Sequence, residues 1–115
     1  MYTAFVQSDL FHAGFSCDGQ PFIAESFYVI IENEDGRRFQ HEARFRSTKR
    51  VVDEETGDPC FLDLREEASA EAERLAARVN AALAVGRGLN GRYWREDSPA
   101  YGSLEYQRRE QMGNL

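Results

Sequence analysis

Residues 25–45 read ESFYVIIENEDGRRFQHEARF, and a single strand register explains this stretch. Residues 34–36 predict a three-residue hairpin loop, with Gly36 at the left-handed bulge position that best suits a residue without a Cβ atom. On one face of the predicted hairpin the pairs are Ile31–Phe39, Val29–His41, Phe27–Ala43 and Glu25–Phe45. On the other face they are Glu32–Arg38, Ile30–Gln40, Tyr28–Glu42 and Ser26–Arg44. The sequence therefore predicts an antiparallel hairpin that sorts apolar from polar side chains.

A two-residue Asp-Gly turn would sort these side chains less well. It would place Ile31 against Gln40 and would mix apolar and polar groups on each face. It would also place Val29 against Glu42. Because a shift by one residue moves every side chain of a strand to the other face, the clean sorting favours the three-residue loop.

A second pattern, over about residues 64–85, predicts an amphipathic helix. Asp63 is the expected N-cap, and Glu66, three residues later, completes a capping-box pattern. Gly86 or Gly88 is expected to end the helix. Apolar residues spaced by three and four form the predicted buried stripe, which consists of Leu64, Ala68, Ala72, Leu75, Val79, Ala82 and Leu83. Because this stripe is rich in small alanine side chains, we expect the helix to lie flat on the apolar face of the hairpin.

The segments around these two elements predict shorter structures. Residues 2–6 indicate a short strand near the N-terminus. Residues 92–95 indicate either an edge strand or an extended segment that packs Trp94 on the core. A short C-terminal helix is expected to begin at Ser98 or at Ser103, since serine is a favoured helix cap.

Together these elements predict a single α+β domain over residues 1–115. It contains a small antiparallel sheet built on the long hairpin, one amphipathic helix packed across that sheet, and an aromatic-rich C-terminal extension. The core is expected over about residues 1–90 and the extension over about residues 91–115. A chain of this length buries roughly two thirds of its unfolded surface, which suffices for a core without a metal or a disulfide.

The composition favours a cytoplasmic protein. The net charge is −6, and this acidity disfavours nonspecific contact with nucleic acid or anionic membranes. No apolar stretch approaches the roughly 20 residues that span a bilayer, and residues 1–10 lack the basic start and apolar run of a secretion signal. Because Cys17 and Cys60 form no CxxC motif, we expect free thiols in a reducing compartment in preference to a disulfide between them.

Few residues suited to catalysis are present. His12 and His41 are the only histidines, and His41 is expected to be a structural residue at a sheet edge. We therefore expect no enzymatic activity, no catalytic residues and no cofactor. The acidic loop 53–58 does not match an EF-hand, and the spacing of the cysteines and histidines fits no zinc finger, so we expect no metal site.

Charge is divided between two stretches of the chain. Residues 37–50 contain six basic residues against one acidic residue, a local charge of +5, and residues 51–75 contain nine acidic against two basic residues, a local charge of −7. Charged stretches of this kind are often ordinary solvated surfaces with no binding role. Either stretch is also suited to docking a charged partner. The acidic candidates for partner binding are Glu66, Glu67, Glu71 and Glu73.

The polar face of the hairpin supplies the other candidates. If nothing covers Tyr28 and Ile30, they mark a protein contact or self-association surface. Trp94, in the C-terminal extension and not on this face, is an aromatic anchor of the type enriched at interfaces. The polar face of the hairpin offers an alternative function as a nucleic-acid-binding sheet, in which arginines meet phosphates and an aromatic ring stacks on bases. The candidate residues for that alternative are Tyr28, Arg38, Arg44 and Arg46.

In size and composition the whole chain resembles accessory proteins of phages and other mobile elements, some of which block host defence complexes by binding them. The resemblance implies an anti-CRISPR-like inhibitor that acts by occupying a host nucleic-acid-handling or defence complex. It rests on no motif, so it assigns no role to any individual residue. The expected partner is a protein; a homodimer is a further option, nucleic acid is less favoured, and no membrane is expected to be involved.

Overall fold

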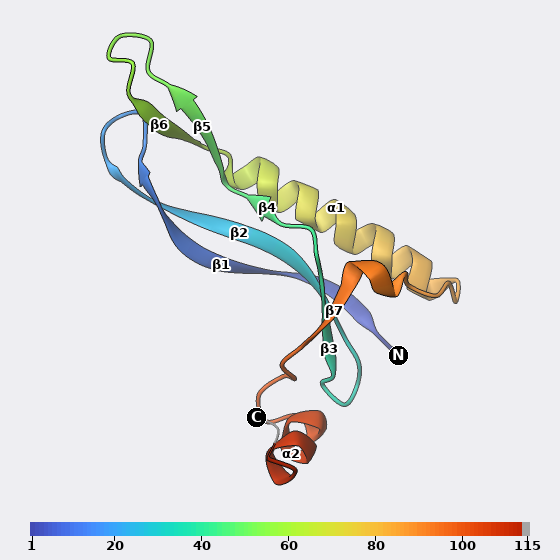
Figure 1. Ribbon diagram of the computed structural model, residues 1–115. Helices are drawn as coiled ribbons and strands as arrows, with labels where there is room; N and C mark the ends of the chain where they lie inside the picture. The colour runs from blue at the N-terminus through green and yellow to red at the C-terminus, as the bar shows by residue number, and fades with distance from the viewer. Residues whose placement is uncertain (114–115) are drawn as a thin grey trace.

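The longest strands of the chain pair with each other near its N-terminus. The computed structural model describes residues 1–113 of the 115. In it, β1 (Thr3–Phe15) and β2 (Pro21–Glu32) form an antiparallel hairpin that starts with Thr3 opposite Glu32 and contains one irregularity near His12. The predicted hairpin is a different and shorter one, over residues 25–45, which pairs β2 with the residues that follow it (Figure 1).

The other side of β2 pairs with two short strands. β3 (Arg38–His41) and β4 (Phe45–Arg46) both run antiparallel to β2, and β7 (Trp94–Asp97) adds an edge strand next to β3. Among the described residues these five strands form one sheet, in which β1 and β7 end the order β1-β2-β3-β7 and β4 pairs with β2 alone.

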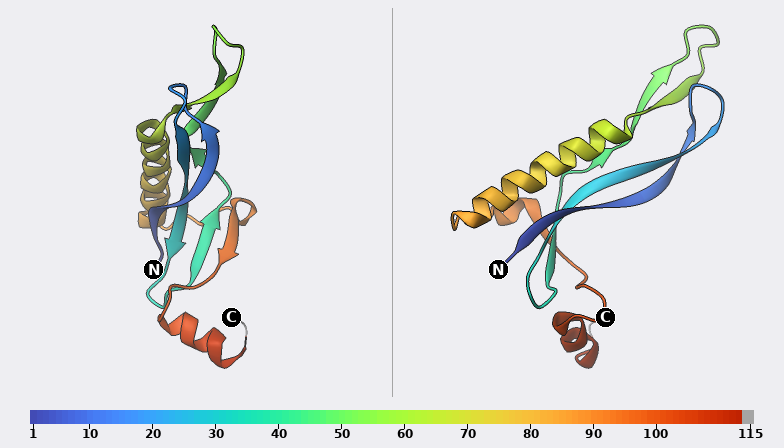
Figure 2. Two further views of the ribbon diagram at one scale, coloured as in Figure 1. Left: turned by 90° about the vertical axis from the view of Figure 1, so that its left-hand side faces the viewer. Right: turned by 180° about the vertical axis from the view of Figure 1, so that it is seen from behind.

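One helix covers this sheet and a second lies away from it. α1 (Arg65–Ala84) packs across one face of β1 and β2 (Figure 1). β5 (Thr48–Val52) and β6 (Pro59–Asp63) form a separate two-stranded sheet at one end of the molecule. At the other end lies α2 (Leu104–Gln111), which follows the single 3-10 turn η1 (Gly91–Tyr93) and β7 (Figure 2). The molecule is elongated: its radius of gyration is 17.9 Å, against about 13 Å for a compact domain of this length.

The predicted loop and the register next to it are confirmed. Gly36 has a φ of 85°, and its N–H donates to the carbonyl of Asn33 at 3.0 Å. The three strand pairs next to the loop are those predicted, namely Ile30–Gln40, Ile31–Phe39 and Glu32–Arg38.

Further from the loop the predicted register is wrong by two residues. Phe27 lies opposite Phe45 instead of Ala43, and Ser26 lies opposite Arg46. The chain leaves the ladder between β3 and β4, and the residues there bulge out of it. Because the shift is an even number, Phe45 and Arg46 stay on their predicted faces.

The predicted packing of α1 against the apolar face of β2 is confirmed, although α1 lies over β1 and β2 instead of over β2 and β3. The core contains Phe27, Val29 and Ile31 from β2, which are 8 %, 0 % and 4 % exposed. Helix residues buried against the strands are Ala68, Ala72, Ala76 and Val79, while Leu75 and Leu83 are half-buried beside them. Ala76 is the one fully buried helix residue that the predicted stripe omits. Alanine shortens the side chains between helix and strands, so the two backbones approach closely.

The ends of α1 differ in how well they match the prediction. Leu64, and not Asp63, is the N-cap residue, and the carboxylate of Asp63 accepts the N–H of Arg65 at 2.9 Å. The expected capping box is therefore not formed. Gly86 ends the helix as predicted, with a φ of 73° and its N–H donating to Leu83 in the pattern of a Schellman motif.

The expectation of free thiols is wrong. Cys17 and Cys60 form a disulfide, with their Cα atoms 5.0 Å apart. The sequence analysis disfavoured this disulfide because no local pattern indicates that Cys17 lies near residues 48–52 and 59–63. These residues form the β5–β6 hairpin, which folds back onto the tip of the β1–β2 hairpin, where Ser16 bridges to Phe61. Among residues 1–113 no helix is long and apolar enough to cross a membrane.

Candidate functional site

The outer face is the side of the large sheet that faces away from α1. Its side chains include Phe5, Gln7, Asp9, Phe11, Tyr28, Ile30, Glu32, Arg38, Arg44 and Arg46. Tyr28 is 8 % exposed and Ile30 is 0 % exposed, so the exposure on which their candidacy as a partner site depended is absent.

Arginines cover the aromatic side chains of the outer face. The guanidinium carbon of Arg44 lies 4.0 Å from the centre of the Tyr28 ring. The corresponding distances are 5.6 Å from Arg38 to Phe5 and 5.4 Å from Arg46 to Phe11. Arginine is well suited to this role, because its planar cation stacks on rings while its stem covers apolar surface.

Carboxylates of the same face partly neutralise these arginines. Arg38 forms an ion pair with Glu32, and Arg44 Nη1 lies 3.2 Å from Asp9 Oδ2. Burial raises the pKa of Tyr28, and the negative charge of Asp9 raises that pKa further. The structure thus brings together all four residues of the nucleic-acid alternative, but two of its three arginines already meet an acid of their own chain.

The acidic face is the solvent side of α1 that carries Glu66, Glu67, Glu71 and Glu73. All four side chains are exposed, and three of them line a shallow pocket together with Ala70 and Arg74. Within residues 1–113, none of the four has a basic nitrogen within 4.0 Å. Glu66 and Glu67 lie in the first helical turn, where the helix dipole favours negative charge.

Trp94 is placed in the core and not on an open surface. It is half-buried against the cluster around Val29 and Ile31, and its ring meets His41 edge-on at 4.9 Å. His41 also stacks on Tyr93, and its Nδ1 accepts the N–H of Ala43 at 3.0 Å. Burial lowers the pKa of His41. The rings of His41 and Trp94 thus pack β3 against β7.

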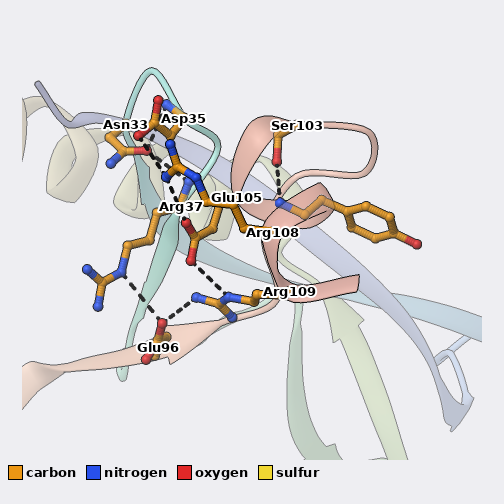
Figure 3. A network of polar contacts seen from close by, with 9 residues as sticks. Asn33, Asp35, Arg37, Glu96, Ser103, Glu105, Arg108 and Arg109 are labelled. Atoms are coloured by element: carbon orange, nitrogen blue, oxygen red, sulfur yellow. Dashed lines mark hydrogen bonds and ion pairs between the residues drawn. The ribbon is translucent and has the colours of Figure 1, made fainter. Parts of the chain in front are cut away.

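The sequence analysis missed a polar network that fixes α2 to the β2–β3 loop (Figure 3). Arg109 pairs with Glu96 of β7 and with Glu105 of its own helix, and Arg108 lies 3.4 Å from Asp35. Gly36 allows the close approach, since a Cβ atom there would lie 2.2 Å from the Cβ of Ser103. Arg108 and Arg109 follow Glu105 by three and four residues, a helical spacing that is a sequence signal for the pairs within α2.

Comparisons of this chain with protein-family models, with curated proteins and with solved structures found no match.

Proposed function

We propose that this chain is a non-enzymatic protein-binding module that docks on a basic surface of a partner protein through the acidic face. The observation that carries the proposal is the contrast between the two charged regions. On the outer face, Arg38 and Arg44 meet carboxylates of their own chain. The carboxylates of the acidic face are exposed and, within the described residues, form no ion pair within 4.0 Å, so their charge is available to a partner.

The spacing of these charges suits a protein that normally holds nucleic acid. Seven residues separate Glu66 from Glu73, which corresponds to about 10 Å along a helix. Four negative charges over that length compare with one per about 3.4 Å along a single strand of DNA. In this proposal the acidic face occupies a phosphate-binding groove, and the chain acts as an inhibitor of the phage or mobile-element type by occupancy.

An inhibitor of this kind acts without turnover. It reaches full effect at one copy per target site and leaves its target chemically unchanged. Capture from a native lysate on immobilised protein, followed by mass spectrometry, identifies the target, and calorimetry then measures the association constant and the stoichiometry.

Two matched variants test the acidic face. Glu67→Lys with Glu71→Lys changes the acidic face, and Glu54→Lys with Glu55→Lys changes the exposed loop between β5 and β6. Each pair raises the net charge by two units per substitution, from −6 to −2. We expect the first pair to weaken binding of the captured target at least tenfold and the second to change it little. Equal affinities for both pairs would show that the acidic face is not the docking surface.

The arginines gathered on the outer face favour phosphate binding, and thus nucleic-acid binding, as a second candidate function; Tyr28 lies beneath Arg44 and is not open to stack on a base. If this face binds phosphates, affinity for single-stranded DNA or RNA falls steeply with salt, and Arg38→Ala with Arg44→Ala flattens that dependence. A gel-shift titration at low salt that detects no complex would remove this candidate.

The disulfide bears on where the chain acts. Inhibition of a host nucleic-acid complex places it in the cytoplasm, where thiols are kept reduced. Mass spectrometry after alkylation in freshly lysed cells distinguishes free thiols from the disulfide. Free Cys17 and Cys60 thiols support cytoplasmic action, whereas a quantitative Cys17–Cys60 disulfide contradicts it.

A further inference from the structure

β1 leaves one long edge of the large sheet without a neighbour. It contains 13 residues and is the terminal strand of the sheet order β1-β2-β3-β7. No other element lies beside the middle of its free side in Figure 1 or in the left view of Figure 2. Its middle part is solvent-exposed, and Leu10 in particular is 68 % exposed.

A single residue of α1 closes this edge at one end. The side chain of Asn80 accepts the N–H of Ala4 at 2.8 Å and donates to the carbonyl of Ala4 at 2.9 Å. It thus replaces the hydrogen bonds that a neighbouring strand would make. In an antiparallel pair the outward-pointing backbone groups belong to alternate residues, so those of Val6, Ser8 and Leu10 also point away from β2. Among residues 1–113 these three have no backbone hydrogen-bond partner on that side.

The sequence along this open edge is complementary to itself. If two copies pair antiparallel with Ser8 opposite Ser8, Val6 faces Leu10 of the other copy on the side of α1. On the outer face, Phe5 then faces Phe11 and Gln7 faces Asp9. Every apolar side chain meets an apolar one, and no like charges meet. The outward backbone groups of the two copies are also in phase, because the pairing joins even-numbered residues to even-numbered residues.

Residues 5–11 also lack the features that usually keep edge strands apart. Natural edge strands carry lysine, proline or bulges that discourage pairing. Residues 5–11 contain Asp9 as their single charged residue, in a chain that is 30 % charged. The irregularity near His12 limits the pairing at one end, as Asn80 does at the other.

We propose that the chain forms a symmetric homodimer by antiparallel pairing of residues 5–11 of β1 about Ser8. The two large sheets become continuous, and both copies of α1 lie on the same side of the joined sheet. This interface uses no residue of the acidic face, so the dimer and the proposed partner binding are independent.

Sedimentation equilibrium of the full chain over a range of protein concentrations tests the dimer and its register. We expect the mass to rise from one to two copies. Ser8→Lys places two ammonium groups face to face and should raise the dissociation constant at least about tenfold. Ser8→Asp should do the same alone, and an equimolar mixture of the two variants should recover the dimer. Val52→Lys adds the same charge at an exposed strand position outside the interface and should leave association unchanged.

Hydrogen exchange followed by NMR provides a second test within the unmodified protein. Raising the concentration should slow exchange at the amides of Ser8 and Leu10, while Gln7 and Asp9, paired with β2, should exchange slowly throughout. A chain that stays monomeric, with fast Ser8 and Leu10 amides at every concentration, would overturn the proposal and leave the edge open to a strand from another protein. A dimer whose dissociation constant is unchanged by Ser8→Lys would overturn the proposal as well.

Discussion

The two faces of β2 are buried equally well but by different means. Phe27 and Tyr28 are neighbours in sequence, point to opposite faces, and are each 8 % exposed. Phe27 packs under alanines of α1, and Tyr28 lies under the guanidinium of Arg44. A closely packed apolar contact on one side and a layer of long charged side chains on the other thus give the same exposure. We expect them to differ in stability, because closely packed apolar side chains resist rearrangement, whereas long charged side chains move more freely.

The largest expected effect is on the face under α1. Phe27→Ala should lower the free energy of unfolding by about 3–5 kcal/mol, because the removed ring leaves a cavity between strand and helix. Chemical denaturation followed by circular dichroism measures the change. An unchanged midpoint would contradict the packing of β2 against α1.

A substitution that enlarges a buried alanine of α1 tests how closely the helix packs on the strands. Ala72 is 0 % exposed, and Ala72→Leu should cost about 1–3 kcal/mol because the strands leave no room for a larger side chain. Ala70→Leu, on the exposed side of the same helix, is the matched control and should change stability little. Equal effects from both would mean that the alanine stripe is not closely packed.

The sequence predicts the packed face better than the arginine-covered face, for a physical reason. Alternation and helical spacing report which side chains avoid water, and they correctly paired Phe27, Val29 and Ile31 with the stripe of α1. The apolar run Phe27–Ile31 is itself typical of a strand buried on both faces. What covers Tyr28, however, depends on where Arg44 lies in space, and the two-residue shift between β3 and β4 sets that position.

The disulfide was disfavoured and the α2 network was missed because contacts between segments far apart in sequence leave no local pattern. Cys17 and Cys60 are 43 residues apart, and they meet only because the β5–β6 hairpin returns to the tip of β1 and β2. Asp35 and Arg108 are similarly distant in sequence. The acidic face, in contrast, was predictable, since helical spacing alone assigns its four glutamates to the solvent side.

On the outer face the expected effect of a single substitution is smaller. Arg44→Ala removes the cation over Tyr28 and the ion pair with Asp9, and it should cost about 1 kcal/mol. Arg44→Lys keeps the charge but loses the planar stacking, so it should recover part of that loss. Urea denaturation of the three proteins at low and high salt measures both contributions. A loss from Arg44→Ala as large as that from Phe27→Ala would show that the two faces are packed alike.

The smallest expected effect is a dependence of stability on alkaline pH. Burial, followed by the charge of Asp9, raises the pKa of Tyr28 above its ordinary value of 10.0. Below that value both folded and unfolded chains keep the phenol proton, and the full contribution to stability is present. As the pH rises further, the unfolded chain loses the proton first, so the free energy of unfolding falls until the folded phenol also ionises.

Tyr28→Phe removes this contribution. Its free energy of unfolding should fall less than that of the wild type between about pH 9 and about pH 11, the range that brackets the ordinary tyrosine pKa. Tyr101→Phe, at a position that is 90 % exposed, is the control and should behave as the wild type does. Urea denaturation at the two pH values measures all three proteins. If Tyr28→Phe loses as much stability as the wild type, the arginine layer leaves the Tyr28 hydroxyl as open to water as that of Tyr101, and the outer face is then a solvated surface despite its low exposure.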